Sequence, residues 1–267
     1  MGSMRTTLAW LLTCLSASQA SAGTISLQIS HRTELREGEL HTVVTLSNGG
    51  DEAAHAVTPV LRFRGAEVRG ATQATLPPGQ PLEVSLAVPS GPLTPGHWPY
   101  EIAVDYADAN LYPFQALSAA TLAVGSPPLP KVQIPPLDSS VLADETEFSV
   151  RVKNISAAEH RVTLKVLAPE AIEVRHASGE MELGPWKELD VPVELTNRAA
   201  LPGSRYALFV MVEYEDGSVH QTLIAQTNVD IRPADAWLGP RGRYLWIGTA
   251  VFGVLFVALV AFRLLRR

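Results

Sequence analysis

A single cysteine, Cys14, is present among the 267 residues, and it lies close to the N-terminus. A chain with one thiol can form no internal disulfide and no cluster of thiolate ligands. The seven histidines include no HExxH motif and no pair spaced to share one metal ion. Neither a GxSxG motif nor a glycine-rich phosphate loop is found. We therefore expect no catalytic residue, no metal ion and no bound cofactor.

Basic residues are also scarce in most of the chain. All 27 acidic residues fall between positions 23 and 240, together with only 15 of the 21 basic ones, which gives this part a formal charge of −12. A nucleic-acid binder needs a basic face to neutralise phosphates, so we exclude nucleic acid as a partner. Arginines outnumber lysines 17 to 4 and alanine is abundant, which favours a GC-rich bacterial genome.

Residues 1–22 have the order of elements that is typical of a secretory signal peptide. One arginine precedes a short apolar run, which gives way to small residues ending in Ala20-Ser21-Ala22. We expect cleavage after Ala22, with Ala20 as the alternative, and either site removes Cys14. A lipoprotein-type cleavage at Cys14 is less favoured, because Thr13 fits poorly before the cysteine.

The opposite end carries an uncharged apolar run of 19 residues, 244–262. A helix of this length covers about 28 Å, close to the ~30 Å hydrocarbon core of a bilayer, so we predict a transmembrane helix. Aromatic side chains that favour the membrane interface lie at its outer edge: Trp237, Tyr244 and Trp246. Arginines follow its other edge: Arg263, Arg266 and Arg267. Because a cleaved signal places the bulk outside, we expect residues 263–267 to be a cytoplasmic tail.

The region between these ends repeats itself. Three segments recur in the same order at offsets of 106–108 residues, which indicates two copies of one domain. The matched segments are Glu39–Asn48 with Glu145–Asn154, Leu82–Leu86 with Leu189–Val193, and Tyr100–Asp108 with Tyr206–Asp216. Each segment alternates between apolar and other residues with period two, the pattern of strands with one face on a core. No sustained helical period occurs between 23 and 235.

We therefore predict an all-β fold: two tandem immunoglobulin-like β-sandwich domains followed by one C-terminal transmembrane α-helix. The domains are expected at 23–125 and 138–233, joined by a proline-rich linker at 126–137, with a juxtamembrane segment at 234–243. Prolines at this density predict an extended, semi-rigid spacer, so that the first domain projects beyond the second.

Each copy resembles the CARDB-type and fibronectin-like Ig domains of bacterial envelope proteins. The resemblance rests on a strand ending in asparagine (Asn48, Asn154), a Leu-Pro-Pro-Gly turn at 76–79, and a Pro-Gly pair that precedes a strand beginning with tyrosine. It implies a structural tyrosine corner at Tyr100 and Tyr206, in which the hydroxyl bonds a nearby backbone group. It implies a sandwich with an adhesive or scaffolding use, and no particular ligand.

Two further sets of residues are weaker candidates for sites. Acidic residues near one strand end of each copy suit a calcium ion only if six or more oxygens converge: Asp105, Asp108, Glu213, Glu215 and Asp216. We favour solvated turns instead, with Asp105 and Glu213 on the outer faces of their sheets. Trp98 and Trp186 are expected to cap the ends of sandwich cores rather than to bind a ligand. The sequon at Asn154 is explained by its place at a strand end.

These features predict a non-catalytic, single-pass protein of the cytoplasmic membrane, with its bulk in the periplasm or extracellular space. It would act by contact with other envelope or membrane proteins, or with surface polysaccharide. The alternative is an accessory or assembly subunit of a larger membrane complex, which it contacts through both the Ig-like domains and the transmembrane helix. Gly248 and Gly253 favour this alternative slightly, because small residues let helices approach closely.

Overall fold

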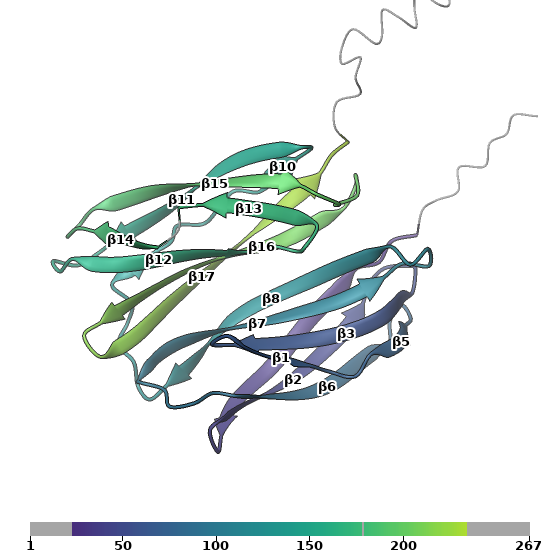
Figure 1. Cartoon of the computed structure of the whole chain (residues 1–267), viewed down its shortest axis with the longest axis horizontal. Helices are drawn as coiled ribbons and strands as arrows, with labels where there is room; N and C mark the ends of the chain where they lie inside the picture. Colours follow the sequence, from purple (N-terminus) through teal and green to yellow (C-terminus); the bar gives the residue numbers. More distant parts are fainter. Residues whose placement is uncertain (1–22, 178, 234–267) are drawn as a thin grey trace, which may run out of the picture.

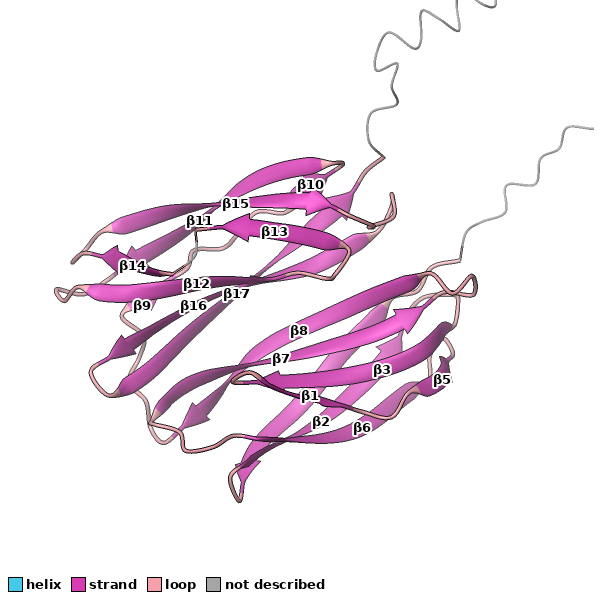
Figure 2. Cartoon of the chain, viewed as in Figure 1, coloured by secondary structure: helices cyan, strands magenta, loops and turns pink. Residues whose placement is uncertain are grey.

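The computed structural model describes residues 23–177 and 179–233, which form strands and loops (Figures 1 and 2). The predicted all-β fold built from sandwiched sheets is confirmed for this part of the chain. The predicted signal peptide, juxtamembrane segment, transmembrane helix and tail lie outside the described residues. Outside them too are the predicted interface and topology residues: Trp237, Tyr244, Trp246, Arg263, Arg266 and Arg267. Within the described ranges, no helix has the length and apolar character that crossing a bilayer requires.

The first sandwich uses residues 27–124. One sheet has the order β1-β2-β6 and contains β1 (Leu27–Arg36), β2 (Glu39–Asn48) and β6 (Pro81–Pro89). The facing sheet contains β3 (Ala54–Phe63), β4 (Ala66–Arg69), β5 (Gln73–Leu76), β7 (Gly96–Ala107) and β8 (Pro113–Val124). In this sheet β7 lies between β3 and β8. The expected alternation along β7 is confirmed, because Tyr100, Ile102 and Val104 all lie in the buried core.

The second sandwich repeats this plan. Its outer sheet has the order β13-β15-β11-β9 and contains β9 (Val132–Gln133), β11 (Glu145–Asn154), β13 (Ile172–His176) and β15 (Glu188–Asn197). Its other sheet contains β10 (Ser140–Leu142), β12 (His160–Leu167), β14 (Glu180–Leu183), β16 (Arg205–Asp216) and β17 (Val219–Ile231). Strand β9 falls within the predicted linker and pairs with β11. The linker therefore contributes a short edge strand to the second domain.

A buried asparagine closes the same strand in both copies. The Asn154 side chain is fully buried; its amide donates to the carbonyls of Ala158, Leu183 and Gly184, and its oxygen accepts from the backbone N–H of Ser156 at 2.9 Å. Asn48 is bonded in the same manner, to Glu52, Leu76 and Gly50 among others. Each asparagine thus joins the loop that follows its strand to the end of another strand, β5 or β14, about 30 residues further along the chain. Such burial leaves the Asn154 amide inaccessible to glycosylation in the folded protein.

The two sandwiches lie side by side and not end to end. Figure 1 shows four layers of strands, in which the β3-β7-β8 layer of the first domain faces the β12-β16-β17 layer of the second. A single parallel bridge between Gly96 and His220 also connects the two facing sheets. The described chain starts and ends on the same side of the molecule, at the right in Figure 1. The prediction that the first domain projects beyond the second is therefore wrong.

Candidate functional site

Apolar side chains from both domains form a separate cluster between the sandwiches. The first domain contributes Val60, Ala103 and Leu117, and the second contributes Leu167, Phe209 and Met211, all of them buried. On β16 the side chains of Phe209 and Met211 point away from their own sandwich core, which contains Leu208, Val210 and Val212. Strand β16 is therefore buried on both faces, as strands inside multilayer folds are.

The bridge between the domains requires a glycine at position 96. A Cβ atom built there would lie 2.1 Å from the carbonyl oxygen of His220, which is far closer than van der Waals contact. The backbone N–H of His220 donates to the carbonyl of Pro95 at 3.1 Å. Glycine lets the two backbones approach this closely. The Pro95-Gly96 pair thus makes an interdomain contact in addition to a turn.

Trp98 lies in the domain interface. One face of its ring stacks on His220 of the second domain, with ring centroids 3.9 Å apart and planes 14° apart. The guanidinium of Arg64 lies 4.9 Å from the ring centroid of Trp98. That guanidinium is fixed by hydrogen bonds to the carbonyls of Ser90 and Pro92, each at 3.0 Å. Trp98 packs against the core of its own sandwich, as the sequence predicted, and it also contacts the neighbouring domain.

Two carboxylates surround the imidazole of His220. Its Nδ1 lies 2.7 Å from Oε1 of Glu215 and its Nε2 lies 3.4 Å from Oε2 of Glu213. Burial lowers the pKa of His220, but hydrogen bonds to these two glutamates and their negative charges outweigh burial, so the pKa is raised above its ordinary value. Protonated His220 is thus favoured in contact with both carboxylates and the face of Trp98.

This arrangement makes the stability of the protein depend on pH. Folding raises the pKa of His220, so its contribution is complete below the unfolded pKa of 6.5 and is lost as pH rises through the folded pKa. We expect the free energy of unfolding of residues 23–233 to exceed that of a His220→Gln variant by more at about pH 5.5 than at about pH 8. Chemical denaturation of both proteins at the two pH values measures this difference. An equal difference at both pH values would contradict the assignment.

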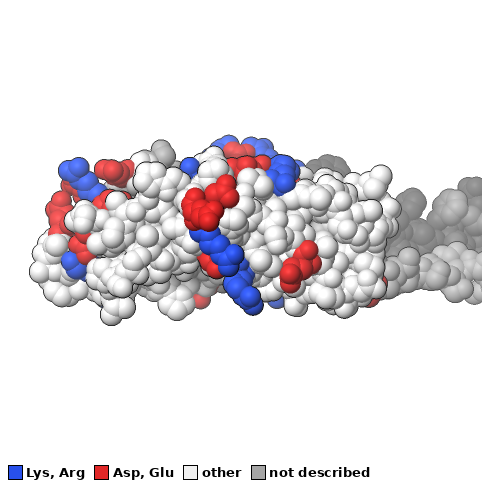
Figure 3. Space-filling view, turned by 90° about the horizontal axis from the view of Figure 1, so that it is seen from below, with Lys and Arg blue, Asp and Glu red and all other residues white. Residues whose placement is uncertain are grey.

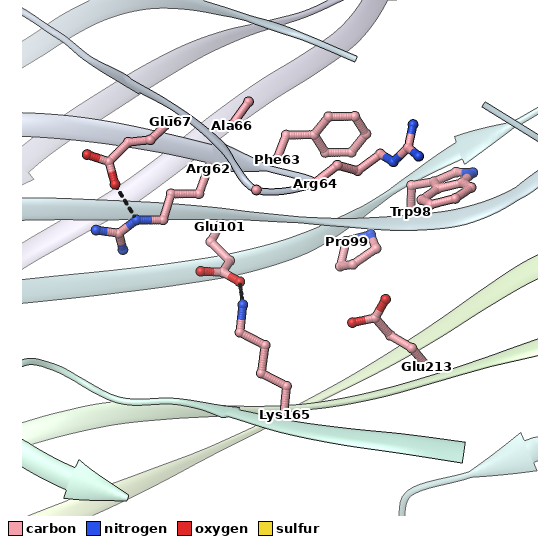
Figure 4. Close-up of a pocket in the computed structure, with 11 residues that line it drawn as sticks. Arg62, Phe63, Arg64, Ala66, Glu67, Trp98, Pro99, Glu101, Lys165 and Glu213 are labelled. Carbon is pink, nitrogen blue, oxygen red and sulfur yellow. Dashed lines mark hydrogen bonds and ion pairs between the residues drawn. The ribbon is translucent and has the colours of Figure 1, made fainter. Parts of the chain in front are cut away.

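A cleft of about 370 Å³ opens beside this interface (Figure 4). Its charged lining is largely paired: Glu101 accepts from Lys165 across the domain boundary, and Nε of Arg62 lies 2.8 Å from Oε2 of Glu67. Glu213 reaches the same cleft from β16. The ion pair of Glu101 with Lys165 joins the two domains, and it orients a largely buried carboxylate. The cleft can hold a small polar molecule, and its lining residues include no pairing of a nucleophile with a base.

The acidic residues considered for calcium have other partners. Asp105 bonds Gln115 at 2.7 Å and Arg69 at 3.0 Å, while Asp216 pairs with Lys131 at 2.8 Å. Asp108 accepts from the backbone of its own turn, and Glu213 and Glu215 contact His220. Across the described ranges, no group of three or more acidic, histidine or cysteine side chains is placed to hold a metal ion. Asp105 and Glu213 lie on the outer faces of their sheets, as expected. These outer faces are not directed to solvent, because each of them packs against the other domain.

The two predicted corner tyrosines, Tyr100 and Tyr206, are both buried. The Tyr100 hydroxyl lies 3.0 Å from Nδ1 of His31 on β1, and so it links the two sheets of its sandwich. Burial raises the pKa of Tyr206, against a smaller opposing effect of the Ser204 side chain. Among the described residues, the partner found for the Tyr100 hydroxyl is the His31 side chain and not nearby backbone, and the corner role of the two tyrosines stays a prediction. A backbone bond is made by Tyr214, whose hydroxyl accepts from the N–H of Lys131 at 2.7 Å.

Large apolar side chains are exposed at both ends of the molecule. Trp186, in the loop between β14 and β15, is 67% exposed, and Leu129, in the segment between β8 and β9, is 88% exposed; both segments lie at the left end in Figure 1. Leu111, in the β7–β8 loop, is 76% exposed and Leu201, in the β15–β16 loop, is 37% exposed; both loops lie at the right end. Leu111 and Trp186 both have positive φ angles, 63° and 58°, at the tips of loops. Exposed Trp186 also departs from the predicted role of capping a core.

No protein-family model and no curated protein matches the chain. Among solved structures, it is similar to native Escherichia coli α2-macroglobulin, with 12% identity, 79% of this chain and 17% of that chain covered, and a TM-score of 0.31. It is similar to red sea bream transglutaminase, with 12% identity, coverage of 76% and 31%, and a TM-score of 0.27. A protein of unknown function from Porphyromonas gingivalis also matches at 12% identity, with coverage of 76% and 99% and a TM-score of 0.33.

The chain spans less than a third of the α2-macroglobulin and transglutaminase chains. Likenesses at these scores support no argument about the fold or the activity of this chain. The resemblance to CARDB-type domains stays a prediction. The sheets of the described residues show by themselves an all-β protein that is built from packed β-sandwiches.

Proposed function

We propose that the protein is a single-pass protein of the bacterial envelope that displays its two sandwiches on the outer side of the cytoplasmic membrane. The signal-like residues 1–22 and the uncharged apolar run 244–262 support this location. The displayed part acts by contact with another protein or with a surface polysaccharide, and it performs no chemistry of its own.

The observation that carries this proposal is the position of the chain ends. Residues 23 and 233 both lie at the right end of the double sandwich in Figure 1, which we call the proximal end. An anchor that follows residue 243 would hold this end toward the bilayer and turn the opposite, distal end outward. There Trp186 and Leu129 are exposed on loops. Exposed aromatic side chains are frequent anchors of protein contacts, so we assign the partner contact to the distal end.

A photo-crosslinking residue placed in the full-length protein tests this proposal. We expect benzoylphenylalanine at position 186 to give a defined adduct in cells, recovered with the membrane fraction. The matched control is position 85, because Ser85 is also exposed, on the outer face of the β1-β2-β6 sheet. Adducts from position 85 alone, adducts from neither position, or recovery of the protein from the cytosol would overturn the proposal.

A further inference from the structure

A proline-rich segment at the distal end, residues 126–130, connects the last strand of the first domain to the second domain (Figure 1). It reads Ser-Pro-Pro-Leu-Pro, and we call it the proline ridge. Proline fixes its own φ at about −65° and keeps the residue before it extended. Each of the five residues is a proline or precedes one, and these described residues form neither helix, strand nor turn. The ridge is therefore restricted to the extended polyproline II conformation.

Hydrogen bonds from the second domain hold the proline ridge in place. Gln221, a fully buried side chain on β17, donates from Nε2 to the carbonyl of Pro128 at 3.0 Å. At Lys131, which follows the ridge, the N–H donates to the Tyr214 hydroxyl at 2.7 Å. The carbonyl of Lys131 accepts from the N–H of Ile155 at 2.9 Å. The position and shape of the ridge are thus set before any partner binds.

The proline ridge presents apolar side chains and hydrogen-bond acceptors to solvent. Leu129 is 88% exposed, and Pro128 beside it is exposed as well. Proline has no backbone N–H, so most of the ridge can only accept hydrogen bonds. Within the described residues, no hydrogen bond to the carbonyls of Pro127 and Leu129 is found. A complementary surface must therefore combine apolar area with hydrogen-bond donors, as tryptophan and tyrosine side chains do.

Charged residues surround the proline ridge but do not lie on it. Residues 113–130 contain no charged side chain, and the ammonium of Lys131 pairs with Asp216 at 2.8 Å. Exposed charges such as Glu159 and Lys187 lie in the neighbouring distal loops. Figure 3 shows charged residues of both signs at this left end, on one face of the molecule. An apolar centre with a polar border is the usual anatomy of a protein–protein contact.

Trp186 lies on the same surface as the proline ridge. Ile155 of the β11–β12 loop (155–159) bonds Lys131 at the end of the ridge. In the same loop, the carbonyl of Ser156 accepts from the N–H of Trp186 at 3.2 Å. One partner surface can therefore contact the ridge and Trp186 together.

We propose that the proline ridge docks in an aromatic-lined groove of a partner protein, with Leu129 in a pocket of that groove. This inference rests on the partner contact proposed above, and it names the chemistry of the partner surface. Grooves lined by tryptophan and tyrosine bind polyproline II segments, because such a segment is already extended and loses little entropy on binding. The buried side chain of Gln221 and the bonds at Lys131 strengthen this advantage by fixing the ridge on the domain.

Benzoylphenylalanine at position 186 of the full-length protein tests this docking in cells. We expect Leu129→Asp to lower the yield of the adduct by at least about tenfold, since a charge replaces the apolar anchor of the contact. Pro128→Ala is expected to lower the yield about two- to fivefold, because alanine restores an N–H and loosens the chain. The matched control is Leu111→Asp at the proximal end, which should leave the yield unchanged. Leu111 is 76% exposed, and aspartate tolerates its φ of 63°.

An adduct that either ridge substitution leaves unchanged would overturn the docking of the ridge, while the partner contact itself would stand. Equal losses for Leu129→Asp and Leu111→Asp would overturn it too, as would an adduct that resists protease and is therefore a polysaccharide. Absence of any adduct from the parent protein would contradict the proposed function, so the two failures are distinguishable. Because Leu129 and Leu111 are both exposed, neither substitution removes a buried contact, and both variants are expected to fold.

Discussion

Asn154→Ala is expected to lower the free energy of unfolding by about 3 kcal/mol, since several buried polar groups lose their partner at once. The amide of Asn154 donates to three carbonyls, and its oxygen accepts from both the N–H and the hydroxyl of Ser156. Alanine leaves these groups buried without a replacement. Denaturant unfolding of residues 23–233 measures the effect.

Asn228→Ala is the matched control, because Asn228 is exposed on β17, and we expect its substitution to change stability by less than about 0.5 kcal/mol. Asn48→Ala in the first domain should resemble Asn154→Ala, since its side chain is equally buried and bonded to the equivalent loops. If Asn154→Ala were as mild as the control, the asparagine would not be fixing the loops as described.

The sequence allowed the sheets to be predicted because period-two alternation follows directly from strand geometry. The core positions of β7 and β16 were identified in this way, and their side chains lie in the two sandwich cores. The repeated asparagine at the end of one strand was also visible as a motif. Its hydrogen-bond partners could not be predicted, because they include the ends of strands about 30 residues away in the chain.

Sequence reasoning missed the packing of one sandwich on the other. The signal was present in β16, where Leu208 to Val212 is an uninterrupted apolar run, the pattern of a strand buried on both faces. On β7 the corresponding outward positions are Glu101, Ala103 and Asp105, which resemble an ordinary solvated face. Glu101 is nevertheless buried, because Lys165 of the other domain pairs with it.

The hydrogen-bond partners of the tyrosine hydroxyls could not be predicted from the sequence either. A tyrosine that follows a Pro-Gly turn suggested a bond to nearby backbone, but Tyr100 bonds His31 on the opposite sheet. Burial lowers the pKa of His31, which favours its neutral form as the partner of a hydroxyl. The choice of partner depends on how the sheets approach one another, and that distance is a property of the whole core.

Phe209→Ala is expected to destabilise residues 23–233 by about 3 kcal/mol, in the range for removing a buried phenylalanine ring. The ring of Phe209 is 5% exposed, yet it contacts the first domain and lies outside the core of its own sandwich. The same substitution in the second domain alone would remove a ring that faces solvent. The loss in free energy of unfolding that Phe209→Ala causes therefore shows whether the two domains are packed together.

The assignment of proximal and distal ends, and with it both proposals, depends on the side-by-side packing of the two sandwiches. The free energy of unfolding of Phe209→Ala, compared with that of Leu129→Ala at an 88% exposed position, tests this packing most directly. We expect a loss of about 3 kcal/mol for Phe209→Ala and almost none for Leu129→Ala. Equal, negligible effects of the two substitutions would mean that the sandwiches are separate, and would contradict this account.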